Sequence, residues 1–347
     1  WNPQVPPNTV TGPWHPAFRS WDSSADGLVR DPGHSGVAAL REELATSNCQ
    51  PEVHVLTPDA QNYTAHALQL FQRDGFVVVE KVLSQERLSK LRNATERILG
   101  HILAADPDGD FGGGAGKLPY RYSLGDASAT KANFHVPEYC DLIDLPSTTR
   151  ILRAIFESDN YWAAGSGGDV VLAGALEYQA LHMDAIWGAL PGVPQDQVIP
   201  PVVTVNFVLH DLGSTSGPIR KVRGSHRWKT PPPTLAEEPA WMRFSTLCPL
   251  RAGSVIIRDN RCWHGGTPNL SDRLRALPNI EYFAPGGQPS FGWLDRVTMP
   301  FENWQRLSPF AQHLARGIVA PPGAEIPGAG LHAPWAILEL MAFMGEQ

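Results

Sequence analysis

The stretch that decides the fold runs from Val170 to Asp184. It opens with the apolar run VVLAGAL at Val170–Leu176 and closes with Leu181-His182-Met183-Asp184. The apolar run is typical of a buried strand, and the closing segment predicts an extended chain. Because side chains alternate across a strand, His182 and Asp184 point to the same side. One imidazole and one carboxylate on one face are two of the three ligands of the facial triad, which holds non-haem Fe(II) with open coordination positions.

Short strands separated by glycine-containing turns continue this pattern. We expect strands at Val170–Leu176, Val202–Leu209, Ile219–Arg223, Cys248–Leu250, Ser254–Arg258 and Pro278–Phe283. Several short strands at such spacing indicate a sandwich or barrel. Before them, apolar residues recur at helical spacing in residues 65–71 and 84–99, on either side of the β-branched strand Phe76–Val79. The pattern predicts an α+β protein that is mainly β, with helices flanking a β core.

Proline and glycine divide the chain into two parts. Residues 1–60 are rich in both, and also contain several tryptophans, so we expect an arm that packs on the core and carries one short helix at Val37–Ala45. Residues 61–347 are expected to form a single domain. Its β core should lie at about 170–285 and its helical C-terminal extension at about 300–347.

Composition argues against several classes of protein. The 347 residues are 42% hydrophobic and 18% charged, as in an ordered globular protein, and the net charge is −7. This charge and the absence of a Lys/Arg run argue against nucleic-acid binding, and the longest apolar runs are too short for a membrane span. None of the four cysteines forms a C-x-x-C pair, and no signal peptide is visible. We expect a cytoplasmic protein, or one in an organelle interior after removal of a targeting segment.

The third ligand candidate is His264, which follows the strand expected at Ser254–Arg258. Arg275 stands eleven residues after it. A site of two histidines and one carboxylate leaves coordination positions for a 2-oxo acid and for O2. The remote carboxylate of 2-oxoglutarate needs a planar, bidentate cation, which arginine provides better than lysine. Arg273, two residues before Arg275, is the alternative partner for that carboxylate.

Together these segments resemble the phytanoyl-CoA dioxygenase family of Fe(II)- and 2-oxoglutarate-dependent oxygenases. The resemblance covers most of residues 65–285 and rests on Phe71–Val79 (FQRDGFVVV), Leu181–Asp184, Gly217–Trp228 (GPIRKVRGSHRW) and Trp263–Arg275. It implies a double-stranded β-helix core, the cupin-like jelly roll. It also implies His182, Asp184 and His264 as iron ligands and Arg275 as the residue that binds 2-oxoglutarate. Arg223 departs from the proline that the family often has before Gly-Ser-His, which affects the stiffness of that loop more than the iron site.

Further candidate residues lie near these motifs. We expect Thr204, Asn206, Gln179 and Lys131 to reach 2-oxoglutarate, and Trp187, Asn133 and Trp263 to line the substrate pocket. Each has a structural alternative, which is a buried hydrogen bond, core packing or a solvated loop position. His226, in the Gly-Ser-His loop, is interpreted as structural.

The resemblance implies an oxygenase that requires Fe(II), 2-oxoglutarate and O2, releases succinate and CO2, and hydroxylates an unactivated C–H bond of a small organic molecule. Desaturation, ring formation and epoxidation use the same site. Related halogenases have a small residue at the carboxylate position, so Asp184 argues against halogenation. Two other classes stay open: a non-redox metalloenzyme of the cupin type, which would not need Arg275, and a silent binding relative, which would not need the triad. We expect a small-molecule substrate, no nucleic-acid or membrane partner, and a monomer or homodimer.

Overall fold

Seven strands form the larger of two sheets. They are β1 (Val55–Leu56), β2 (Phe76–Val79), β3 (Arg121–Gly125), β4 (Trp162–Val171), β5 (Val202–Phe207), β7 (Val255–Asp259) and β9 (Arg275–Phe283). Their order across the sheet is β1-β2-β7-β5-β9-β4-β3, and all neighbours are antiparallel except β1 and β2. The structure, a computed structural model, describes residues 37–46, 55–59, 61–105, 121–125, 133–184, 199–285, 297–324 and 326.

The smaller sheet pairs β6 (Ile219–Lys221) with β8 (His264–Gly266). Single bridges extend it, among them Ala175 to Asn269 and His182 to His264. An apolar cluster that combines Ile256 of the larger sheet with Ile219 of the smaller one lies between the two sheets. Two mainly antiparallel sheets packed face to face, with the chain crossing between them, are the predicted double-stranded β-helix. The mainly β fold with a jelly-roll core is therefore confirmed.

Side-chain alternation gives the larger sheet an apolar outer face and a partly polar inner face. On the outer face, Val205, Ile257 and Ile280 lie in one register row and belong to the main hydrophobic core. On the inner face, Arg258, Thr204 and Glu281 form a register row that looks toward the smaller sheet. Polar side chains between two sheets cost free energy unless they are paired, so this row marks the interior that the sequence motifs also indicate.

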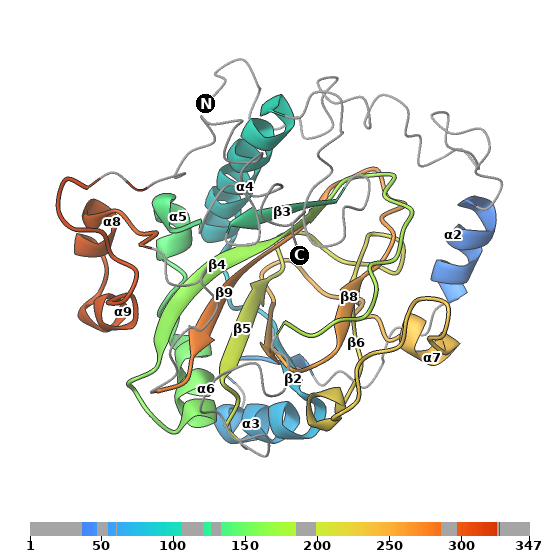
Figure 1. The fold of residues 1–347 in the computed structure, drawn as a ribbon, viewed down its shortest axis with the longest axis horizontal. Coiled ribbons are helices and arrows are strands. Elements are labelled where there is room, and N and C mark those ends of the chain that lie inside the picture. The colour runs from blue at the N-terminus through green and yellow to red at the C-terminus, as the bar shows by residue number, and fades with distance from the viewer. Residues whose placement is uncertain are drawn as a thin grey trace, which may run out of the picture.

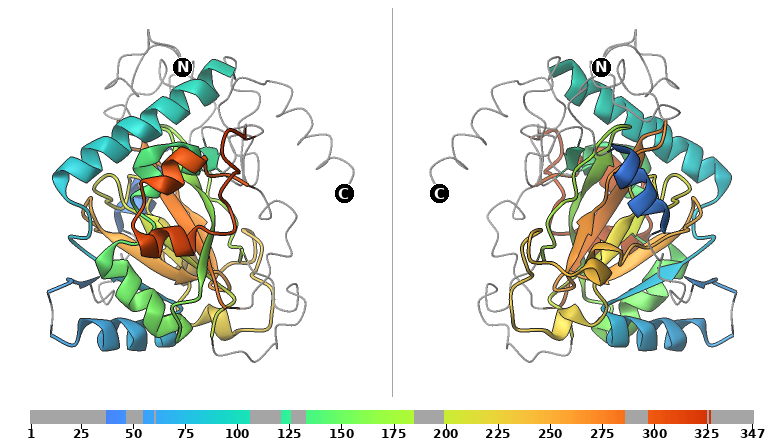
Figure 2. Two further views of the ribbon diagram at one scale, coloured as in Figure 1. Left: turned by 90° about the vertical axis from the view of Figure 1, so that its left-hand side faces the viewer. Right: turned by 90° about the vertical axis from the view of Figure 1, so that its right-hand side faces the viewer.

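Helices flank both sheets (Figure 1). The helices are α2 (Val37–Thr46), α3 (Tyr63–Asp74), α4 (Gln85–Ala105), α5 (Pro137–Cys140), α6 (Pro146–Phe156), α7 (Ala240–Arg243), α8 (Phe301–Gln305) and α9 (Pro309–Leu314), with short 3-10 turns at Asn133–His135 and Ser225–Arg227. Helices α3 and α6 lie together at one end of β5, and α8 and α9 lie on the side opposite α2 and α7 (Figure 1). The two side views separate these groups, with α8 and α9 in front in one and α2 in front in the other (Figure 2).

Strand β4 differs from the strand expected at Val170–Leu176, because it starts at Trp162 and ends at Val171. Its middle contains Gly165, Gly167 and Gly168, which carry no side chains that signal a strand. The sheet needs at least one of them: a Cβ on Gly168 would lie 2.3 Å from the carbonyl oxygen of Leu277 on β9. At Gly168 the backbones of β4 and β9 approach so closely that no side chain fits between them. The strand expected at Cys248–Leu250 is likewise reduced to a bridge between Leu250 and Leu212.

The motif Phe71–Val79 contacts the Gly-Ser-His loop at Gly75, which ends α3 with a φ of 85°. The Gly-Ser-His loop packs on it: the Gly224 N–H donates to the Asp74 carbonyl oxygen at 2.9 Å. A Cβ on Gly75 would lie 2.5 Å from Nδ1 of His226. His226 thus contacts the start of the sheet, in agreement with its structural interpretation.

Gly75→Ala is expected to lower the free energy of unfolding by about 2–4 kcal/mol, because the new methyl group enters the His226 ring and φ is left-handed. Gly213→Ala is the matched control, since a Cβ there meets no atom within 4 Å. Urea unfolding of both variants measures the difference. Equal midpoints for the two variants would show that the contact between the motifs is loose.

The arm predicted at residues 1–60 is described in part. Its helix α2 agrees with the helix expected at Val37–Ala45, and Val37 and Leu44 pack against Leu176 and Leu270 of the core. Residues 1–36, 47–54 and 60 lie outside the described part of the chain, as do residues 327–347 of the expected C-terminal extension. Helices α8 and α9 account for the described part of that extension.

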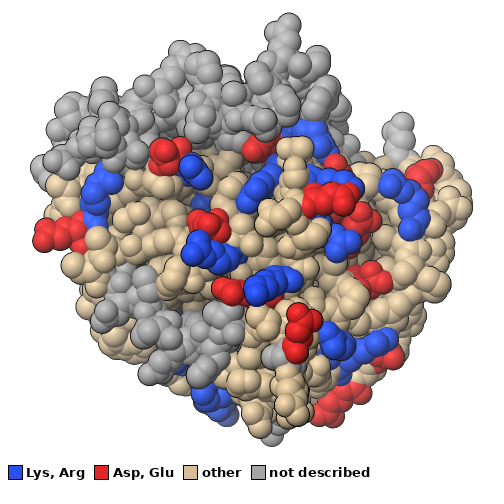
Figure 3. All heavy atoms as spheres, turned by 180° about the vertical axis from the view of Figure 1, so that it is seen from behind, with Lys and Arg blue, Asp and Glu red and all other residues tan. Residues whose placement is uncertain are grey.

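The described surface mixes charges of both signs. On the face seen from behind, Lys and Arg side chains are interspersed with Asp and Glu, so neither sign dominates the described part of that face (Figure 3). In the described part of the chain, no helix combines the length and the apolar character that crossing a bilayer requires.

Candidate active site

His182 and His264 lie opposite each other in the smaller sheet. Each backbone N–H donates to the carbonyl oxygen of the other at 2.9 Å, and the ring centroids are 4.3 Å apart. Asp184 turns to the same side: its Oδ1 lies 3.6 Å from Nε2 of His182, and its Oδ2 lies 3.4 Å from Nε2 of His264. All three ligand atoms lie within 4.8 Å of one another. The structure thus brings together the three residues that the spacing selected.

The protonation of this group suits a metal ion. Nδ1 of His182 lies 3.0 Å from the Ala180 carbonyl oxygen, and Nδ1 of His264 lies 3.0 Å from that of Cys262. A carbonyl only accepts, so each Nδ1 carries a proton, and the Nε2 atoms are the ring nitrogens that face Asp184. Burial lowers the pKa of His264 well below its ordinary value, so this ring is neutral at pH 7. The neutral His264 ring then presents its Nε2 lone pair beside the Asp184 carboxylate, an arrangement that a cation such as Fe(II) stabilises.

Asp184 is held in place by its backbone and by its carboxylate. Its N–H donates to the Asn260 carbonyl oxygen at 2.9 Å, and its Oδ2 accepts a hydrogen bond of 2.5 Å from Nη2 of Arg258. Loss of hydration alone would raise the pKa of Asp184, but the Arg258 charge and this hydrogen bond hold the pKa far below its usual range. The carboxylate is therefore ionised at neutral pH, as a metal ligand must be.

Arg258 is the centre of a buried hydrogen-bond network on the inner face. Its Nε donates to Oδ1 of Asn206 at 3.2 Å, and its Nη1 donates to Oδ1 of Asn260 at 3.3 Å. The Thr204 hydroxyl donates to the same Asn260 oxygen at 2.5 Å. These contacts are the interstrand hydrogen bonds that were the structural alternative for Thr204 and Asn206. Contact of either residue with 2-oxoglutarate stays a prediction.

Arg258→Met is expected to weaken metal binding by about 10- to 100-fold, because residues that orient a ligand carboxylate typically contribute that much. Arg251→Met is the control: its side chain is 77% exposed and pairs with Asp211 at the surface. Metal dissociation constants measured by competition with a chelator decide the matter. The same weakening in both variants would mean that lost charge, rather than the contact with Asp184, caused it.

Arg275 enters the interior, whereas Arg273 stays outside. Arg275 is 3% exposed, and its Nε donates to the Gly217 carbonyl oxygen at 2.7 Å. Burial lowers its pKa to about 9, with a further contribution from the nearby Arg121. The Arg273 side chain is 81% exposed beside Asp272. The described hydrogen bonds of Arg275 go only to carbonyl oxygens, so this buried cation retains the capacity to bind a carboxylate.

Gln179 and Asn133 are both buried, and each side chain binds the backbone of a strand. Oε1 of Gln179 accepts the Gly266 N–H at 3.0 Å, two residues along β8 from His264. Nδ2 of Asn133 donates to the Gly167 carbonyl oxygen at 3.3 Å on β4. Contacts of Gln179 with 2-oxoglutarate and of Asn133 with the substrate stay predictions.

Trp263 is not brought to the site. As the neighbour of His264 in sequence, it points to the opposite face, where its ring meets Trp228 edge-on at 4.8 Å between centroids, in a cluster with Leu181 and Met242. These contacts agree with the structural alternative for Trp263, which is core packing. Lys131 and Trp187 lie outside the described residues.

Four residues of this interior were not predicted: Arg121, Arg258, Asn260 and Glu281. Glu281 stands opposite Thr204 in the register, and burial, together with the Asp184 carboxylate, raises its pKa to about 7. A signal was available for Arg258 and Glu281, since each is a charged residue within an apolar strand, in phase with residues that face inward. Arg121 carries no such signal, because its place depends on the pairing of β3 with β4.

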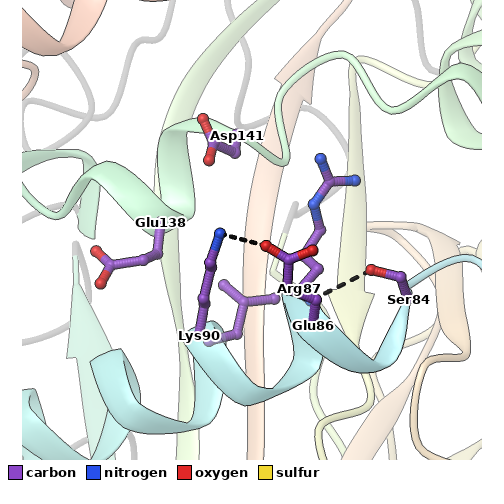
Figure 4. Close-up of a pocket in the computed structure, with 7 residues that line it drawn as sticks. Ser84, Glu86, Arg87, Lys90, Glu138 and Asp141 are labelled. Carbon is purple, nitrogen blue, oxygen red and sulfur yellow. Dashed lines mark hydrogen bonds and ion pairs between the residues drawn. The ribbon is translucent and has the colours of Figure 1, made fainter.

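A separate surface cavity of about 200 Å³ lies where α4 begins, beside α5. Its lining residues are Ser84, Glu86, Arg87, Lys90, Leu91, Glu138 and Asp141. Their side chains mix both signs, and Lys90 already pairs with Glu86 at 2.7 Å (Figure 4). None of them belongs to the group around His182, so this cavity does not extend the candidate site.

Comparison with known proteins gives one family. The sequence profile of the phytanoyl-CoA dioxygenase family matches residues 71–277, which is more than half of the chain and includes all three candidate ligands and Arg275. The match confirms the resemblance that the motifs carry.

Solved structures with similar folds have low sequence identity. The non-haem α-ketoglutarate-dependent epimerase SnoN from nogalamycin biosynthesis is 18% identical, with a TM-score of 0.51 over 67% of this chain and 88% of that chain. The structure of SnoN in complex with Fe3+, α-ketoglutarate and nogalamycin RO has a TM-score of 0.50 and is 18% identical, over 67% of this chain and 89% of that chain. AviO1 from Streptomyces viridochromogenes Tue57 is 22% identical over 66% of this chain and 99% of that chain, with a TM-score of 0.47. At these identities the SnoN structures support the fold alone.

Proposed function

The chain belongs to the phytanoyl-CoA dioxygenase family, and from this premise we propose that it hydroxylates an unactivated C–H bond of a small organic molecule. As a member of this family it is a non-haem iron enzyme that depends on 2-oxoglutarate and O2. The observation that supports the proposal most directly is the group of His182, Asp184 and His264, with its lone pairs and charge directed at one point. The buried Arg275 adds a partner for the cosubstrate.

The residues divide the work as follows. His182, Asp184 and His264 hold the iron, and Arg275 holds the carboxylate of 2-oxoglutarate that is remote from it. Fe(II) and 2-oxoglutarate, with O2, supply the oxidising power, and succinate and CO2 are released. The Ala180 and Cys262 carbonyls fix the tautomers of the two histidines. Arg258 keeps Asp184 ionised and oriented.

The inner face of the larger sheet supplies a polar environment next to the iron site. Thr204, Asn206 and Asn260 keep Arg258 in one orientation. Their hydrogen bonds are complete before any ligand binds, so the site needs little reorganisation to accept one. Apolar side chains between the sheets, such as Ile256 and Leu277, limit access of water to this interior.

A desaturase, cyclase or epoxidase would use the same residues, and these reactions are the alternatives within the class. A non-redox metalloenzyme of the cupin type would not require a buried arginine to bind the carboxylate of a 2-oxo acid. A silent binding relative would not require two histidines whose tautomers are both fixed for metal binding. Arg275 and the His182 and His264 hydrogen bonds therefore favour the oxygenase.

The test is a screen of metabolite extracts with the iron-loaded protein, 2-oxoglutarate and isotopically labelled O2, read by mass spectrometry. Hydroxylation predicts a product that gains one labelled oxygen atom. Loss of two hydrogens would indicate desaturation or ring closure instead. Unchanged mass with an inverted stereocentre would indicate epimerisation, the activity named for SnoN. An extract compound that is altered without consumption of 2-oxoglutarate would contradict the oxygenase assignment.

A further inference from the structure

Arg121 is a second buried arginine next to Arg275. It opens β3, and the register places Arg121 opposite Val171 of β4, which in turn lies opposite Arg275 of β9. Residues in one register row share a face, so both guanidinium groups belong to the interior between the sheets. Arg121 is 2% exposed.

The hydrogen bonding of Arg121 is incomplete. Its Nη2 donates to the Thr267 carbonyl oxygen at 3.3 Å, but Nε and Nη1 are buried without a hydrogen-bond partner. The charges of Asp169 and Glu177 act on Arg121, yet burial still lowers its pKa. A buried donor without a partner is destabilising, and more so when it is charged. Two neighbouring cations with spare N–H groups are a typical site for an anion.

Gly266 determines where the Arg121 guanidinium lies. A Cβ on Gly266 would lie 2.1 Å from Nη1 of Arg121 and 2.6 Å from its Cζ, so the guanidinium occupies the space that a side chain at this position would fill. Gly266 is two residues after His264 in β8, and residues two apart face the same side. The Arg121 guanidinium therefore lies on the face of β8 that also carries the His264 imidazole, and the two backbone positions, Gly266 and His264, are separated along the strand by about 6.6 Å.

This separation matches the cosubstrate in length. The five-carbon chain of 2-oxoglutarate spans about 5 Å between its two carboxyl carbons when it is extended. A molecule that chelates a metal ion at His264 through its 2-oxo acid end thus brings its far carboxylate to the level of Gly266, where the Arg121 guanidinium lies.

We propose that Arg121 is a second cationic ligand for the remote carboxylate of 2-oxoglutarate, which it shares with Arg275, and that Gly266 is free of a side chain to admit it. The inference rests on the proposed function. The chain would then select a 2-oxo acid with a second carboxylate through two arginines, one from each of the strands β3 and β9 that flank β4.

The test compares two ligands that differ only in the remote carboxylate. Binding of 2-oxoglutarate and of 2-oxopentanoate to the full chain, loaded with Fe(II) and kept free of O2, is measured by calorimetry. Arg121→Met is expected to weaken 2-oxoglutarate binding by about 10- to 100-fold, the usual contribution of a charged hydrogen bond, and to leave 2-oxopentanoate binding unchanged. Arg121→Lys should recover part of the loss, and Gly266→Ser, which displaces the guanidinium, should reproduce part of it. Arg273→Met, an exposed site, is the control for lost charge.

The outcomes distinguish failure of the role of Arg121 from failure of the proposed function. If Arg121→Met weakens the binding of both ligands equally, or of neither, Arg121 is structural and the inference is overturned while the proposed function stands. If the wild-type protein binds neither 2-oxo acid in a metal-dependent manner, the proposed function itself fails. Binding of 2-oxopentanoate by Arg121→Met also shows that the variant is folded.

Discussion

His182→Ala is expected to abolish iron binding and activity together while the fold is retained. The side chain supplies one of three ligand nitrogens or oxygens, and two remaining ligands hold Fe(II) too weakly for stable occupancy. The His182 side chain is 33% exposed, and its backbone hydrogen bonds with His264 do not depend on the imidazole. We therefore expect the melting temperature of the metal-free variant to stay within about 3 °C of the metal-free wild type.

Two further variants sharpen this prediction. Asp184→Asn retains an acceptor for Arg258 but removes the negative charge, so it should lose iron without leaving Arg258 buried and unpaired. His313→Ala is the matched control, because His313 is exposed at the end of α9. Iron content after gel filtration and thermal unfolding are the two measurements. Wild-type iron content in the His182→Ala variant would remove this residue from the ligand set.

Arg275→Met is expected to raise the 2-oxoglutarate concentration for half-maximal activity by about 100-fold or more. Loss of one partner of a buried charge pair costs about 3 kcal/mol, which corresponds to this factor. Iron binding should change little, because the described contacts of Arg275 are with Gly217 and Asp169 rather than with the three ligands. The effect should thus fall on KM for the cosubstrate.

Arg273→Met provides the comparison within the same segment. Its side chain is 81% exposed, so its loss should leave 2-oxoglutarate dependence as in the wild type. Initial rates of succinate formation over a range of 2-oxoglutarate concentrations measure both variants. A large rise in KM for Arg273→Met, with none for Arg275→Met, would reverse the assignment of the two arginines.

The core of the site was predictable because it depends on local periodicity. His182 and Asp184 are two residues apart on an extended segment, and alternation alone places them together. Alternation alone does not decide between Arg275 and Arg273. Residues two apart share a face only within a strand, and β9 begins at Arg275, so Arg273 lies in the preceding turn. The family's spacing, rather than alternation, distinguished the two.

The residues that were not predicted depend on contacts between distant segments. Arg258 meets Asp184 across 74 positions of sequence, and Arg121 meets the chain at Thr267 across 146. Such pairs follow from strand register, which no periodicity in one segment specifies. The same holds for β4, because its glycines carry no side chains that indicate a strand. The reason for Gly168, its close approach to Leu277, becomes visible only once β4 is paired with β9. Trp263 was a candidate because it neighbours His264, but neighbours in a strand face apart.

The most direct test of the central claim follows 2-oxoglutarate, O2 and succinate together in one reaction of the purified, Fe(II)-loaded protein with Asp184→Asn beside it. We predict that the wild type consumes 2-oxoglutarate and O2 and forms succinate in equal amounts. Omission of either Fe(II) or O2 should stop the reaction, and Asp184→Asn should form no succinate. Failure of the iron-loaded wild type to form succinate, with or without metabolite extract, would contradict the central claim.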